Sequence, residues 1–106
     1  LECLTRIDYD DILQNLSAKT LQMKIYYDTA AWQSLDSLLD SVAIYLRRKK
    51  VLGYHKENFS NIVRFMQRLL ALPPGNSAAR EALRQESENC KVLSERGWFL
   101  QKMGYF

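Results

Sequence analysis

The sequence predicts an all-α fold, in which antiparallel helical hairpins are followed by a C-terminal capping helix. Apolar residues recur at spacings of three and four along most of the 106 residues. No segment shows the alternation of apolar and polar residues between turn signals that is typical of a strand. The clearest breaks, at Gly53 and over residues 73–76, leave only short connections. Helices that follow one another are therefore expected to be antiparallel neighbours.

Composition indicates a single globular domain over residues 1–106. Hydrophobic residues make up 47% of the chain and charged residues 25%, which is ordinary for a folded domain and unlike a disordered chain. No apolar run approaches the roughly 20 residues needed to span a bilayer, and charges come too early for a secretory signal. We therefore expect an intracellular, cytoplasmic domain without membrane contact. Since the sequence begins with Leu1, we also expect it to be a piece of a longer chain.

The first helix is predicted from about Tyr9 to Thr29. Carboxylates near its start would complement the helix dipole. Its main apolar face consists of Ile12, Leu13, Leu16, Met23 and Tyr27, with Thr20 between them.

A second apolar stripe on this helix is the candidate interface. It consists of Ala18, Leu21 and Ile25. At 100° per residue, Leu21 lies opposite Ile12, and a helix that is apolar on two sides is packed on two sides. Two coverings remain open: the third helix of this chain, or a neighbour that is either an upstream repeat or a second copy.

The second helix is predicted from about Trp32 to Lys49. We expect Trp32 to be buried between the first two helices, in line with a face made of Leu35, Leu38, Leu39, Val42, Tyr45 and Leu46. Acidic residues come first and basic residues last, as the helix dipole favours.

Three further helices complete the prediction. One runs from about Lys56 to Leu72 after a turn at Gly53. Its apolar face is Phe59, Ile62, Val63, Met66, Leu69 and Leu70, and its opposite face is Glu57, Asn61, Arg64 and Arg68. The next begins at Asn76 or Ser77, which can cap it, and runs to about Glu88. After a break near Cys90, a short last helix passes through Trp98, Leu100 and Met103.

Residues that could carry enzyme chemistry are few. His55 is the only histidine, and no phosphate-binding loop or nucleophile motif accompanies it. Cys3 and Cys90 are too few for an ordinary zinc site and are read as free thiols, although a bridge between them stays open. We therefore expect no enzyme activity, no cofactor and no metal.

The basic run Arg47, Arg48, Lys49 and Lys50 is the candidate basic patch. These four residues could bind the phosphates of a nucleic acid, and Lys56, Arg64 and Arg68 could extend the patch. The simpler interpretation is a solvated helix end, because four consecutive helical residues point in different directions. Nucleic-acid binding is therefore only the alternative function.

The stretch from Met23 to Val42 resembles a tetratricopeptide unit, in which aromatic and small residues at fixed offsets interlock two helices. Tyr26 and Tyr27 match the aromatic region of the family's first helix, and Trp32 matches the aromatic at the turn. The departures are Met23 for a glycine, Ala30 for a turn glycine and Leu35 for an alanine. The hairpins also repeat at roughly 45 residues rather than about 34.

The whole chain, with YLRRKK and SERGWFLQK, also resembles the C-terminal part of uncharacterised bacterial proteins of tetratricopeptide-like architecture. These resemblances imply a scaffold fold. The expected function is a non-enzymatic protein-interaction or scaffolding module of a longer helical solenoid. Its partner would be another protein, upstream repeats or a second copy.

Overall fold

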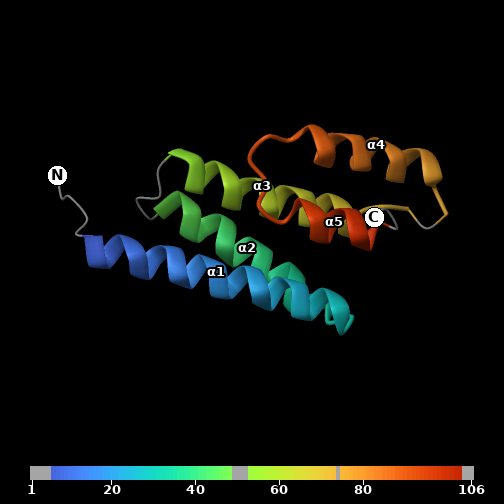
Figure 1. Ribbon diagram of the computed structural model, residues 1–106. Helices are drawn as coiled ribbons and strands as arrows, with labels where there is room; N and C mark the ends of the chain where they lie inside the picture. The colour runs from blue at the N-terminus through green and yellow to red at the C-terminus, as the bar shows by residue number, and fades with distance from the viewer. Residues whose placement is uncertain (1–5, 49–52, 74, 104–106) are drawn as a thin grey trace.

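A computed structural model describes residues 6–48, 53–73 and 75–103, and within these ranges it contains helices and no strand. The helices are α1 (Arg6–Asp28), α2 (Trp32–Arg48), α3 (Gly53–Leu70), α4 (Ser77–Asn89) and α5 (Arg96–Lys102). Successive helices run in opposite directions, with α3 between the α1–α2 hairpin and the α4–α5 pair (Figure 1). The all-α prediction is confirmed.

The turn between α1 and α2 is a Schellman motif built on alanine. The Ala30 N–H donates to the Tyr27 carbonyl at 3.2 Å, and the Ala31 N–H donates to the Tyr26 carbonyl at 2.9 Å. Ala30 has φ of 58°, a left-handed conformation that favours glycine and strains other residues by about 1–2 kcal/mol. The Ala31 carbonyl then accepts the first hydrogen bond of the next helix, from the Leu35 N–H at 2.9 Å.

The core lies where the predicted apolar faces meet. The three longest helices each contribute a stripe at helical spacing, and α4, α5 and the segment between them close the core. Its most deeply buried side chains are Leu16, Met23, Leu35, Leu39, Val42, Ile62, Phe65, Met66, Leu83 and Phe99. The main apolar faces of the first three helices are thus confirmed, except at Trp32.

The prediction that Trp32 is buried between α1 and α2 is wrong. Its side chain is 49% exposed. Side chains on a helix lean towards its N-terminus, and Trp32 is the first residue of α2. No preceding turn lies beneath it, so the ring extends past the end of the hairpin instead of into it.

Several predicted boundaries shift by a few residues. The third helix begins at Gly53 rather than Lys56, and Gly53 has φ of 59°, so the glycine marks the break by opening the helix. Asn76 caps α4 as predicted, its Oδ1 accepting from the Ala79 N–H at 3.0 Å. The break near Cys90 is also confirmed.

Polar side chains hold the irregular segment between α4 and α5 against α3. Asn58 is buried, donates to the Ser94 hydroxyl at 3.0 Å and accepts from the Ser94 N–H at 2.7 Å. Asn61, which the pattern placed on the outer face, donates to the Val92 carbonyl at 2.8 Å. Arg96 donates to the Ser87 and Cys90 carbonyls at the end of α4. This segment fixes where α5 lies.

Candidate functional site

The outer α1 face is defined here as Ala18, Leu21 and Ile25, on the side of α1 away from the core. All three are exposed, Leu21 by 57% and Ile25 by 51%. Helix α3 therefore does not cover this stripe, and that alternative is wrong. Between Gln14 and Ile25, the outward side of α1 carries neutral or apolar residues and no charge, because Lys19 and Lys24 lie on the flanks. An uncharged, apolar strip on an exposed helix is typical of a contact surface.

The flank of α1 nearer α3 is closed by an ion pair. The Lys24 ammonium contacts the Glu95 carboxylate at 2.9 Å, and both side chains are about three-quarters buried. A small hollow beside this pair is lined by Thr20, Leu21 and Ile62, among others. The pair separates the outer α1 face from the core without covering it.

The candidate basic patch is only partly described. Arg47 and Arg48 are exposed at the end of α2, whereas Lys49 and Lys50 lie outside the described residues. Of the residues expected to extend the patch, Lys56 lies in the first turn of α3, just after the connection from α2. Arg68 is bound to Glu86 of α4, and it lies about 18 Å along α3 from Lys56 at 1.5 Å per residue. Arg68 is therefore not part of a patch at the end of α2, and the basic patch stays a prediction.

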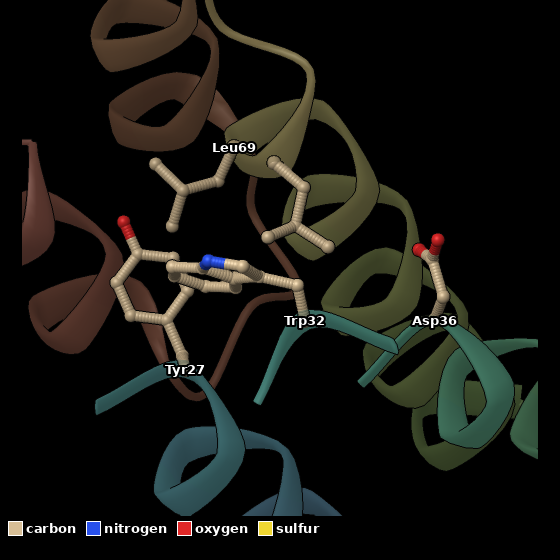
Figure 2. A pocket seen from close by; sticks show the side chains of 5 residues that line it. Tyr27, Trp32, Asp36 and Leu69 are labelled. Atoms are coloured by element: carbon tan, nitrogen blue, oxygen red, sulfur yellow. The ribbon is translucent and has the colours of Figure 1, made fainter. Parts of the chain in front are cut away.

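A groove that the sequence did not reveal lies at the end of the bundle where α1 ends and α2 begins. It consists of two adjoining cavities of about 360 and 400 Å³, both lined by Tyr27 and Leu69. Trp32 lines the first cavity, with Tyr27 on one side of it and Asp36 on the other (Figure 2). We call these two cavities together the end groove.

Aromatic rings connect the end groove to the core. Tyr27 contacts Trp32 and Trp98 edge-on, each with ring centroids 5.4 Å apart. Trp98 in turn contacts the buried Phe99 at 5.2 Å. Burial raises the pKa of the Tyr27 phenol above its ordinary value, an effect that the nearby Lys102 ammonium reduces. Tyr27 therefore stays neutral at physiological pH, and its ring packs between Trp32 and Trp98.

Opposite charges lie in the two cavities. Asp36 lines the first cavity, and Arg80 and Lys102 line the second. Lys102 is engaged by Asp28 at 2.6 Å and lies 5.6 Å from the centre of the Trp98 ring. Asp36 and Arg80 are both exposed, and neither forms an ion pair with any residue in the described ranges. The groove is thus acidic at one end and basic at the other.

The residues considered for chemistry are dispersed. His55 is half-buried near the start of α3, with its ring edge-on to Tyr54 at 5.7 Å. The Cys90 thiol accepts a hydrogen bond from Asn61 at 3.4 Å, and Cys3 lies outside the described residues. Among the residues placed by the structure, no three His, Cys, Asp or Glu side chains gather as metal ligands, and no helix is long and apolar enough to cross a membrane.

Comparison with known proteins supplies no assignment. The chain matches no family model, no curated protein and no solved structure. The resemblance to tetratricopeptide units accordingly stays a prediction from the residues. The function must be inferred from the two surfaces described above, the outer α1 face and the end groove.

Proposed function

We propose that the chain is a non-enzymatic protein-interaction module of tetratricopeptide-like architecture that docks another helix on the outer α1 face. One observation carries the proposal: Leu21 and Ile25 are more than half exposed on the side of α1 opposite its buried stripe. Removing this area from water on docking would stabilise a complex by about 25 cal/mol per Å² of apolar surface.

A second copy of the chain fits this face. When two α1 helices are paired antiparallel about a twofold axis beside Leu21, Ala18 of each helix lies opposite Ile25 of the other. A small residue thereby faces a large one, which is how ridges and grooves of packed helices interlock. The same axis places Leu21 next to its counterpart, as in the self-complementary surface of a twofold dimer.

The test compares the association of wild-type protein with that of Leu21→Glu by sedimentation equilibrium over a range of concentrations. We expect wild-type dimers and monomeric Leu21→Glu, because the substitution brings two carboxylates together at the axis. Since Leu21 is 57% exposed, the variant should lose at most about 1 kcal/mol of unfolding free energy.

The matched control is Ile44→Glu, which introduces the same charge at a 40% exposed position on α2. This variant should still dimerise. A wild type that stays monomeric at all concentrations, or equal dissociation of the two variants, would contradict docking of a second copy on the outer α1 face.

A further inference from the structure

The end groove has the form of a peptide site. Its two cavities share Tyr27 and Leu69 as lining residues, so they lie side by side at this end of the bundle. Each has a volume within the range of ligand sites, about 300–1,000 Å³. An extended peptide segment can contact both cavities at once.

Trp32 provides the central contact of such a site. Half of its indole is exposed, and the ring is held edge-on by Tyr27, which is itself held by Trp98. Its indole N–H donates no hydrogen bond to another described residue and is free for a peptide carbonyl. Tryptophan and tyrosine are the residues that dominate binding energy at interfaces.

The charges indicate the composition of the ligand. Asp36 belongs only to the cavity beside Trp32, and Arg80 belongs only to the cavity beyond Leu69. Complementarity therefore places a basic side chain at the Asp36 end and an acidic one at the Arg80 end. Between them, Trp32 and the leucines of α3 provide an apolar surface.

We propose that the end groove binds an extended peptide segment of another protein, with apolar residues flanked by a basic residue on one side and an acidic residue on the other. A polyproline II segment meets these requirements, because its carbonyls are unpaired and it docks in aromatic-lined grooves with little ordering cost. This site is separate from the outer α1 face and does not depend on docking there.

The experiment measures fluorescence anisotropy of a labelled, end-blocked peptide with the core Lys-Pro-Leu-Pro-Pro-Glu as the protein is titrated in. We expect saturable binding that weakens at least tenfold in Trp32→Ala. The matched control is Tyr54→Ala, which removes an exposed aromatic ring at the opposite end of α3, about 22 Å from Leu69 at 1.5 Å per residue. This control should bind like the wild type.

A charge swap tests the polarity of the groove without altering its apolar surface. Asp36→Lys should weaken binding of the peptide several-fold, and replacing the peptide lysine by glutamate should restore it. Asp36 is exposed, so this variant should fold, which circular dichroism checks.

Three results would overturn the proposal: no saturable binding by the wild type at millimolar protein, equal binding by Trp32→Ala, or no change of charge preference in Asp36→Lys. Leu21→Glu serves as the cross-control, because it should lose dimerisation and keep peptide binding. Failure of the peptide to bind would therefore leave the outer α1 face to be judged by sedimentation alone.

Discussion

Replacing Asn58 by alanine removes the main polar tie between α3 and the segment that precedes α5. Asn58 makes two hydrogen bonds to Ser94, one to its hydroxyl and one from its backbone N–H. A typical hydrogen bond contributes about 0.5–1.5 kcal/mol net, so the two bonds together contribute about 1–3 kcal/mol. We expect Asn58→Ala to lower the free energy of unfolding by about 2–3 kcal/mol.

The loss of unfolding free energy in Asn58→Ala can be compared with the loss in Ser94→Ala. That variant removes only the hydroxyl bond, so its cost should be about 1 kcal/mol. In the double variant, Ser94→Ala should add nothing, since its partner has already gone. The two changes are therefore expected to be non-additive, as is usual for residues in one network.

Urea denaturation of the wild type, both single variants and the double variant checks this cycle. A loss of 2–3 kcal/mol is readily measured against a total stability of about 5–15 kcal/mol. Costs for Asn58→Ala and Ser94→Ala that are equal, or that add in the double variant, would refute the assignment of the tie to these two bonds.

Two further outcomes follow from the structure. Trp32→Ala should lower the free energy of unfolding by about 2–3 kcal/mol in urea denaturation, because about half of an area of roughly 200 Å² is buried. Phe65→Ala, at a core position, should cost about 3–5 kcal/mol. The Arg68 guanidinium, by hydrogen bonding, holds the pKa of Glu86 below its ordinary 4.5 in the folded chain. The pair therefore stabilises the fold above pH 4.5, and this stabilisation is lost as the pH falls through the lowered pKa. In thermal melts, Glu86→Gln should be less stable than wild type at pH 7 by less than about 1 kcal/mol, because the pair is exposed, and the two proteins should become equally stable in strong acid.

The buried faces of the helices were predictable, because a buried helix face places apolar residues three or four apart in the sequence. Leu35, Leu39 and Val42 recur at helical spacing and are all buried. The same rule failed at Trp32, because a helix end lacks the preceding turn that would direct a side chain inwards. Periodicity describes helix interiors well and their ends poorly.

Asn58 and Asn61 show a different limit. Helical periodicity places asparagine outside, yet both side chains bond to polar groups of an irregular segment that lies 36 and 31 residues further along the chain. That segment has no period of its own, so the sequence indicated the break near Cys90 but not which residues of α3 the segment contacts. The end groove was not predicted because it depends on Tyr27 of α1 and Arg80 of α4 lying close together near one end of the bundle, which the pattern within each helix does not determine.

The Schellman turn at Ala30 determines the cost of occupying the end groove. Its hydrogen bonds join backbone atoms, so the turn restrains the angle between α1 and α2 in addition to the core packing of the two helices. Tyr27 and Trp32, on either side of this turn, are consequently ordered before any ligand arrives. A ligand that stacks on them loses its own conformational freedom but little of the protein's, which favours affinity at modest contact area.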